Sequence, residues 1–525
     1  MGDASYITDV AYTGNFAPFL APAALAYTAV LNGYRPPDFN RGFTYCELGC
    51  GKGVSSLVLA AMHAHGEFHA CDINAAHIEH AAALQRAAAV ANLRLHTRSV
   101  EQMQEAADLP AFDFIVAHGL YSWVPDQVRG QIRAFIHARL KPGGLVFLSY
   151  NALPGWAPLL PIRAMLRAYA AHVPGDSFTK ARAAFAYAQR LADGGANVFQ
   201  ASPAARAQLA EIARHDIRYV AHEYLTPHGD PFWFADVERA LRESELVYAD
   251  SLTPSDNYTE LMVPSKLADP IATGSSRTML ETHFDFVANT PFRRDLYARQ
   301  KAMPLPAALP LERFAPFEFA LARLPEQLPL ESAAGAVRFN LRDRASEVRA
   351  IHARLAAAPA DAEAIHQAAG WESESETSLL IQQLAVAQHL IPVPRQRPSL
   401  GWPRLNSALI DSALRERQAS VPLGAPATAA ATPFETVHAV LVEAMASEEE
   451  AAPATSTAFA RLRAAGHPVE LEGPGGQRRA ASDVELRAVL SSGACRLQDG
   501  TSTDRRVLQQ LGLLVCAGTE RTTLP

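Results

Sequence analysis

Three glycines and a preceding acid near residue 50 form the pattern with the clearest chemical meaning. Residues 43–53 read Phe-Thr-Tyr-Cys-Glu-Leu-Gly-Cys-Gly-Lys-Gly, which predicts a short apolar strand that runs into a glycine-rich turn. A helix is predicted directly afterwards, at 54–64. This order of elements brings backbone N–H groups and a helix N-terminus to one point, where a nucleotide-like ligand can bind.

The spacing of these residues separates the turn from the common phosphate-binding loops. Glu47, Gly49, Gly51 and Gly53 give E-x-G-x-G-x-G, not the dinucleotide pattern G-x-G-x-x-G. The turn also differs from G-x-x-x-x-G-K-[ST], so Lys52 is not a triphosphate-binding lysine. A side chain at Gly49 or Gly51 would fill the space in which a ligand lies against the backbone, or forbid the required φ.

A second acid follows about 20 residues later, a spacing typical of βαβ units. Asp72 ends the segment 67–72, which predicts a second strand, and Ile73 follows it. In a βαβ unit such a carboxylate lies beside the ligand and accepts hydrogen bonds from both ribose hydroxyls. Each of these charge-assisted bonds contributes roughly 1.5–3 kcal/mol. The alternative is a solvated acid at a strand end, but the spacing from the glycine turn favours the ligand.

Strands and helices alternate through the first 156 residues, which predicts a parallel, doubly wound α/β sheet. The predicted strands are 43–48, 67–72, 93–97, 112–117 and 144–150, and the predicted helices are 54–64, 74–91, 100–106 and 126–140. A strand at 246–249, another within 284–299 and a late helix complete a seven-stranded sheet with an antiparallel final pair.

Polar and aromatic residues gather where the fourth and fifth strands end. His118, Tyr121 and Trp123 follow the fourth strand, and Tyr150, Asn151 and Trp156 end or follow the fifth. Ligands of open α/β sheets bind at the carboxyl ends of the strands. For any one of these residues, packing is as good an explanation as substrate contact, but two such clusters at adjacent strand ends favour a site.

Composition bounds the class of protein. The 525 residues are 49% hydrophobic and 19% charged, with a formal charge of −7, which predicts a globular chain of two to four domains with no general attraction to nucleic acid. Five cysteines in this length do not form a disulfide framework. We find no signal-peptide pattern and no apolar run of about 20 residues. We therefore expect a cytoplasmic location, no membrane insertion and no metal site.

The rest of the chain predicts four regions. They are an N-terminal lead-in with a helix at 22–32 (1–42), a catalytic domain (43–302) with a helical insertion (157–217) and a following segment (218–302), and two winged-helix-like α+β modules (303–396 and 397–525). The lead-in aromatics either cover the sheet or close over the ligand. The insertion is expected to cap the site. Residues 424–433 are expected to be a low-complexity tether, and 448–453 a mobile acidic segment.

The glycine turn resembles the first motif of class I S-adenosylmethionine (SAM) methyltransferases, and Leu-Lys-Pro-Gly-Gly at 140–144 matches a turn of the same class. The segments 25–37, 118–125 and 222–225 are similar to a bacterial branch that carries a methyltransferase regulatory domain. That branch includes the rickettsial-type protein lysine methyltransferases that act on outer-membrane proteins. The resemblance covers about residues 1–300 and leaves the substrate open.

The resemblance implies SAM as the cofactor, with Glu47 facing its cationic methionine end. The family often has an Asp that reads the adenine amine where Ser99 stands here. The expected cofactor contacts are Glu47, Gly49, Gly51, Gly53, Asp72, Ile73, Ser99, Val100 and His118.

The predicted reaction is methyl transfer, with a protein lysine as the first acceptor. The amine must lose its proton, which costs roughly 4–5 kcal/mol at pH 7 for a lysine pKa near 10.4. His118, Tyr121 and Tyr150 are the group expected to receive that proton. Trp123, Asn151, Trp156 and Tyr224 are expected to contact the substrate. The alternatives are methylation of a small molecule or sugar, and a non-catalytic SAM-sensing adaptor; the oligomeric state stays open.

Overall fold

The computed structural model describes residues 9, 16–258, 263–268, 276–304, 309–334, 337–396, 401–448, 450–472, 478–499 and 501–514. Among these residues, no helix is both long and apolar enough to cross a bilayer.

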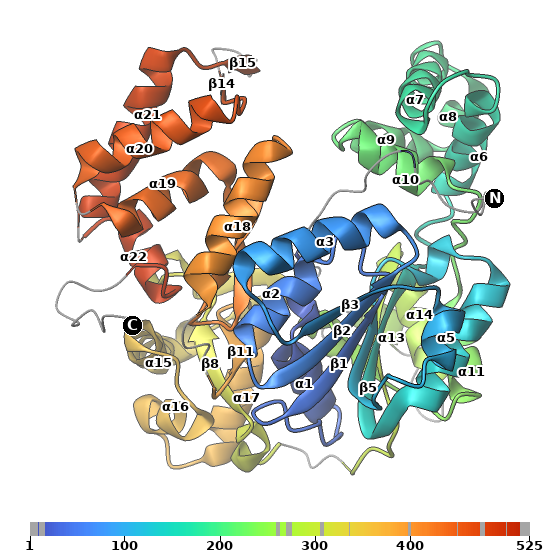
Figure 1. The fold of residues 1–525 in the computed structure, drawn as a ribbon. Helices are drawn as coiled ribbons and strands as arrows, with labels where there is room; N and C mark the ends of the chain where they lie inside the picture. The colour runs from blue at the N-terminus through green and yellow to red at the C-terminus, as the bar shows by residue number, and fades with distance from the viewer. Residues whose placement is uncertain are drawn as a thin grey trace.

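A seven-stranded sheet forms the centre of the first 300 residues (Figure 1). Its order is β3-β2-β1-β4-β5-β7-β6, with β7 antiparallel to both neighbours and the first five strands parallel. The strands are β1 (Phe43–Leu48), β2 (Gly66–Asp72), β3 (Leu93–Thr97), β4 (Phe112–Ala117), β5 (Leu140–Asn151), β6 (Val247–Ser251) and β7 (Phe292–Ala298). The predicted parallel, doubly wound, Rossmann-like α/β sheet with its antiparallel final pair is therefore confirmed.

Both faces of the sheet are buried, which explains why its strands read as nearly continuous apolar runs. Along β5, Leu145 and Phe147 belong to one apolar cluster and Val146 and Leu148 to the other, because successive side chains point to opposite faces. The first face is covered by α1 (Pro22–Leu31), α2 (Val54–Met62) and α3 (Ala75–Ala88). The second is covered by α4 (Val100–Glu105), α5 (Asp126–Arg139) and α11 (Phe234–Arg242).

The predicted helical insertion is a lobe with a core of its own. It lies to one side of the sheet, in green in Figure 1. Its helices are α6 (Leu159–Ala170), α7 (Ser177–Asp193), α8 (Asn197–Ala201), α9 (Pro203–Ile212) and α10 (Ile217–Leu225). Because α10 packs on α6 and α7, the lobe continues past residue 217, where the sequence suggested a boundary.

Two further modules follow residue 309. The first contains β8 (Phe317–Leu321), β9 (Glu331–Ala334), β10 (Val337–Asn340), α15 (Ala345–Ala357), α16 (Ala362–Ala369), α17 (Glu374–Val386) and β11 (Leu390–Pro394). The second contains α18 (Trp402–Arg415), β12 (Ser420–Ala425), β13 (Ala430–Glu435), α19 (Thr436–Ser447), α20 (Ala451–Ala464), β14 (Glu470–Glu472), β15 (Arg478–Ala480), α21 (Asp483–Gln498) and α22 (Thr503–Gln510). Their assignment as winged-helix-like modules stays a prediction.

Two local predictions are wrong. Residues 424–433 are not a tether: most of them lie in the antiparallel hairpin β12–β13, which packs on α2. The Gly424 backbone lies so close to that helix that a Cβ would come within 2.5 Å of Met62 Cε. The strand predicted within 284–299 is β7, and residues 284–287 end the preceding helix α14 (Arg277–Ala288). Residues 451–453 begin α20 instead of belonging to a loose acidic segment.

The sheet domain shares its core with both C-terminal modules. Tyr27 of α1 packs among Phe314, Phe317 and Phe319, with ring centroids 5.7–6.1 Å away. The same apolar cluster continues into Leu405 of α18. The proline-rich segment after residue 302 therefore joins parts that are packed together, not independent domains.

Candidate functional site

The glycine turn after β1 has the backbone that its residues predict. Gly49, Gly51 and Gly53 have φ values of 70°, 53° and 68°, a region that other residues rarely adopt. A Cβ at Gly53 would lie 2.9 Å from Ala81 Cβ, and one at Gly49 would lie 3.0 Å from Leu120 Cδ1. Beside Gly51 there is open space, so a ligand can approach the backbone there.

Asp72 joins the end of β2 to this turn. The Gly51 N–H donates to Asp72 Oδ2 at 2.9 Å, and the Asn74 N–H donates to Oδ1 at 2.8 Å. The Cys50 N–H donates to the Cys71 carbonyl at 2.9 Å. The two predicted strand ends are thus held together, with the carboxylate fixed against the turn.

The neighbours of Asp72 differ in exposure. Ile73 has 58% of its surface exposed, which offers an apolar face beside the acid, whereas Val100 is buried at the start of α4. Ser99 forms a capping box: its Oγ accepts from the Gln102 N–H at 3.2 Å, and its own N–H donates to Gln102 Oε1 at 2.9 Å. Its N–H and one lone pair of its Oγ are therefore already used within α4, which weakens the predicted adenine contact. The Ser-x-x-Gln spacing is a capping signal that sequence reasoning overlooked.

Glu47 lies beneath the turn. It is buried, and its carboxylate accepts a hydrogen bond from the Ser56 hydroxyl of α2. Burial, together with the negative charge of Asp72, raises the pKa of Glu47 to about 7. Near neutral pH this carboxyl therefore exchanges its proton readily and gains from a nearby positive charge.

His118 stands at the end of β4, as predicted, among side chains that the sequence did not single out. Its Nδ1 lies 2.9 Å from Ser149 Oγ, which also accepts from the Gly119 N–H at 2.8 Å. The Phe19 ring of η1 (Pro18–Leu20) packs edge-on against the imidazole at 5.0 Å. Burial, and then Arg294, lower the pKa of His118 to about 4, so the ring is neutral at pH 7 and accepts protons weakly.

The lead-in therefore reaches the site through Phe19. Phe16 is partly buried against the core. The other lead-in aromatics, Tyr6 and Tyr12, lie outside the described residues.

The structure separates the three residues of the predicted proton-accepting trio. Tyr150 is fully buried and its hydroxyl donates to Asp295 Oδ2 at 2.7 Å, and burial raises its pKa well above the usual value. The buried Tyr121 hydroxyl accepts from Arg133 Nη1 at 3.0 Å, towards α5. Both tyrosines belong to the core of the second sheet face, so only His118 stays beside the cofactor turn.

Three of the four predicted substrate contacts are core residues of the helical lobe. Trp123, Trp156 and Tyr224 are buried in its apolar cluster, and the two indole rings meet at 6.4 Å. The two tryptophans join the lobe to the segments that follow β4 and β5, so packing accounts for all three side chains, and their contact with a substrate stays a prediction.

Asn151 is different. Its N–H donates to Ser122 Oγ at 2.8 Å, and its buried Nδ2 has no hydrogen-bond partner in the described structure. A buried amide group of this kind is normally satisfied by a ligand or water. Ser149 lies on the same face of β5 as Asn151. This pair of polar residues, two positions apart in an otherwise apolar strand, is the sequence pattern that could have identified Ser149 as a site residue.

Comparison with known proteins places these elements in a family. Residues 46–146 match the family described as "Methyltransferase domain", and residues 216–299 match "Predicted methyltransferase regulatory domain". The chain carries a methyltransferase domain with its regulatory domain. These two matches confirm the family resemblance, and they confirm the enzyme class at the level of the methyltransferase domain.

Relatives extend the match beyond the sheet. An uncharacterized protein of Synechocystis is 33% identical over 331 residues, which cover 62% of this chain and 65% of the relative. An uncharacterized protein of Rickettsia prowazekii is 26% identical over 280 residues, 52% of this chain and 49% of the relative. The chain thus matches about half of one relative and just under two thirds of the other.

A solved structure matches the whole architecture. PKMT2 from Rickettsia typhi, in complex with AdoHcy, superimposes with a TM-score of 0.69 at 17% identity over 94% of this chain and 99% of PKMT2. At this identity the likeness establishes the fold, C-terminal modules included, and no more.

Proposed function

We propose that the whole chain is a SAM-dependent methyltransferase that methylates lysine side chains of a protein. The observation that carries the proposal is the joined pair of strand ends, where the Gly51 N–H is bonded to Asp72 and Glu47 lies beneath. In this proposal the Asp72 carboxylate keeps its backbone bonds and uses its remaining lone pairs to accept from the ribose hydroxyls, and Ile73 packs on the adenine. Glu47 ionises opposite the cationic methionine end.

The surroundings of His118 suit a neutral amine. Phe19, Phe147 and Phe292 surround the imidazole with ring centroids 5.0–6.3 Å from it. Desolvation among aromatic rings lowers a lysine pKa, and the positive charge of Arg294 lowers it further. The proton can then leave to water before transfer, so a strong base beside the amine is not required. Alignment of the amine with the methyl carbon supplies the remaining acceleration.

Two observations support a protein acceptor over a small molecule. The fold follows rickettsial PKMT2 through the C-terminal modules, not through the sheet alone. The sequence resemblance points to the rickettsial-type protein lysine methyltransferases. Asn151 Nδ2, unpartnered at the end of β5, would donate to a carbonyl of the bound segment.

Labelled SAM tests the proposal. The full-length chain is incubated with methyl-labelled SAM and a fractionated bacterial lysate, with Asp72→Asn as the matched inactive control. Label in protein, assigned to lysine by mass spectrometry and absent with the control, is expected. Label in small molecules alone would favour the small-molecule alternative. SAM binding with no labelled acceptor would favour an adaptor. Truncation cannot make this distinction, since the C-terminal modules share the core of the sheet domain.

A further inference from the structure

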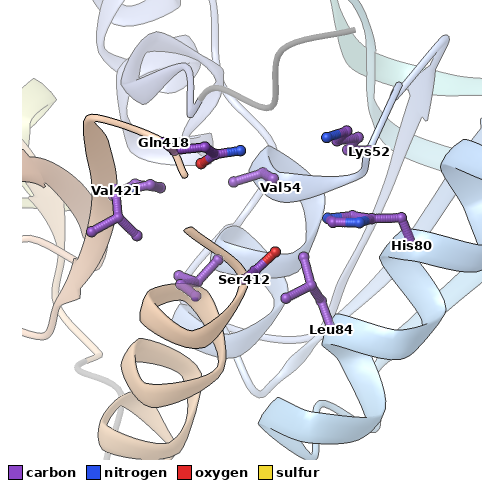
Figure 2. Close-up of a pocket in the computed structure, with 9 residues that line it drawn as sticks. Lys52, Val54, His80, Leu84, Ser412, Gln418 and Val421 are labelled. Carbon is purple, nitrogen blue, oxygen red and sulfur yellow. The ribbon is translucent and has the colours of Figure 1, made fainter. Parts of the chain in front are cut away.

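The lysine of the glycine turn points away from the expected ligand and into the second C-terminal module. Lys52 Nζ lies 2.6 Å from Glu416 Oε2, and the lysine side chain is only 8% exposed. Glu416 is the C-cap residue of α18. Figure 2 shows Lys52 and His80 from the sheet domain on one side of a small pocket, opposite Ser412 and Gln418 from the module.

Glu416 is itself held in place by several groups. Gln418 Nε2 donates to its Oε2 at 2.8 Å, and His80 Nδ1 of α3 lies 3.2 Å from its Oε1. Burial raises the pKa of Glu416, but the hydrogen bond and charge of Lys52, with His80, outweigh burial and hold the pKa below its usual value. Burial lowers the pKa of His80, so Lys52 and Glu416 form the charged pair at neutral pH.

The module that carries Glu416 is fixed on the sheet domain by other contacts. Helix α18 packs along α3, where Arg404 Nε donates to the Ala87 carbonyl at 2.9 Å. Leu409 of α18 belongs to the core cluster that also contains Leu57 of α2. Strand β13 packs on η1, the element whose Phe19 lies against His118. Glu416 is therefore presented to Lys52 from a rigid support.

The turn depends on such a support because glycines do not restrict it. Lys52 stands between Gly51 and Gly53, both in the left-handed region, and the Gly51 N–H is the group bonded to Asp72. Glycine has the widest choice of backbone conformations, so the contacts of the one intervening side chain add to the backbone bonds at Cys50 and Gly51 in selecting the productive conformation. A turn that is already ordered binds its ligand at lower entropic cost.

We propose that Glu416 is a positioning residue: through Lys52, the docked second C-terminal module holds the glycine turn in its cofactor-binding conformation and thereby sets the SAM affinity. This inference rests on the proposed function, because it concerns the same cofactor. It gives the second C-terminal module a direct effect on the catalytic domain, so an acceptor or partner that shifts α18 would change cofactor binding.

Calorimetric titration with SAM tests the inference on the full-length chain. Glu416→Gln and Glu416→Ala are expected to raise the Kd for SAM roughly tenfold, with the alanine variant at least as weak, because the turn loses its support. The KM for SAM should rise in parallel, while kcat at saturating SAM stays within about twofold of wild type, since the pair touches no reacting atom. The charge-reversed double variant K52E/E416K should recover part of the lost affinity.

Asp411→Asn is the matched control. It removes one acidic charge from the same helix, but Asp411 pairs with Arg461 inside the module, at 2.6 Å. Its SAM affinity should equal that of wild type. A variant that melts early can still be judged by hydrogen exchange. By linkage, SAM should slow exchange in α18 of wild type, and this effect should be lost in Glu416→Gln.

The outcomes separate the two proposals. Wild type that fails to bind SAM would refute the proposed function, and this inference with it. The inference alone would be overturned if wild type binds SAM and the Glu416 variants show the same SAM affinity and the same hydrogen exchange in α18 as wild type. Equal loss in Asp411→Asn and Glu416→Gln would reduce Glu416 to a general stability role, which also overturns it.

Discussion

The helical lobe and the second C-terminal module relate to the cofactor turn in opposite ways. The lobe lies next to the site in sequence, yet it packs around its own core and joins the sheet through Trp123 and Trp156. The module begins some 350 residues after the turn, yet it shares the core of the sheet domain and reaches Lys52 directly. Proximity in sequence is therefore a poor guide to which region contacts the glycine turn.

The comparison depends on the cofactor site itself, which Asp72 is proposed to form. Asp72→Asn should therefore change the affinity for SAM more than any other substitution. Its carboxylate would lose two charge-assisted bonds to ribose, each worth roughly 1.5–3 kcal/mol, and the Kd for SAM should rise about 100-fold or more. Calorimetry measures this directly. An unchanged Kd would remove Asp72 from the site and leave the comparison without a reference.

A matched pair of core substitutions could break the comparison. Leu409→Ala in α18 and Leu166→Ala in α6 each empty a buried leucine site, at a cost of about 2–5 kcal/mol. Leu409→Ala should raise the Kd for SAM several-fold because it loosens the module on α2 and α3. Leu166→Ala should leave the Kd within about twofold because the lobe has a separate core. Denaturant melts measure the loss of stability in both variants, and calorimetry measures the Kd for SAM. Equal changes in Kd would contradict the difference between the lobe and the module.

A pH series sharpens the comparison inside the turn that the module supports. The folded pKa of Glu47, raised by burial to about 7, lies above its unfolded value, so its contribution to stability is lost as pH rises through 7. Cationic SAM favours the ionised form. The Kd for SAM should therefore fall roughly tenfold from pH 6 to pH 8. At pH 6, where Glu47 is mostly protonated, SAM binding should release a proton to solvent. Glu47→Gln should flatten this dependence, and a flat profile in wild type would count against the role of Glu47.

Ser99→Ala should have the smallest effect on binding. It removes the cap of α4, which costs about 1 kcal/mol of stability, whereas the Kd for SAM should change less than about twofold. Thermal melts and calorimetry separate the two quantities. A tenfold loss of affinity would restore Ser99 as an adenine contact.

Much of the sheet domain could be predicted because local spacing determines it. The glycine turn, Asp72 and the first four strand–helix units follow patterns that span fewer than 30 residues each. Tertiary packing decided the rest. The hairpin β12–β13 has an Ala/Thr/Pro composition that hides its alternation, and it gains its burial from α2 and α18.

Outside the glycine turn, the site residues were predicted from their residue types, without regard to the face of the strand on which each side chain lies. Tyr150 carries the more suggestive side chain, but β5 turns it into the core and presents Ser149 and Asn151 on the opposite face. Trp123 and Trp156 pack into a lobe whose position no local pattern reveals. The Lys52–Glu416 pair joins residues 364 positions apart, so only the folded chain shows it.

A crystal structure of the full-length chain with SAM bound tests the central claim most directly. We predict that both ribose hydroxyls lie within hydrogen-bonding distance of the Asp72 carboxylate and that the methionine end lies above Glu47, with Lys52 still paired to Glu416. SAM bound elsewhere, or a ribose turned away from Asp72, would contradict the account.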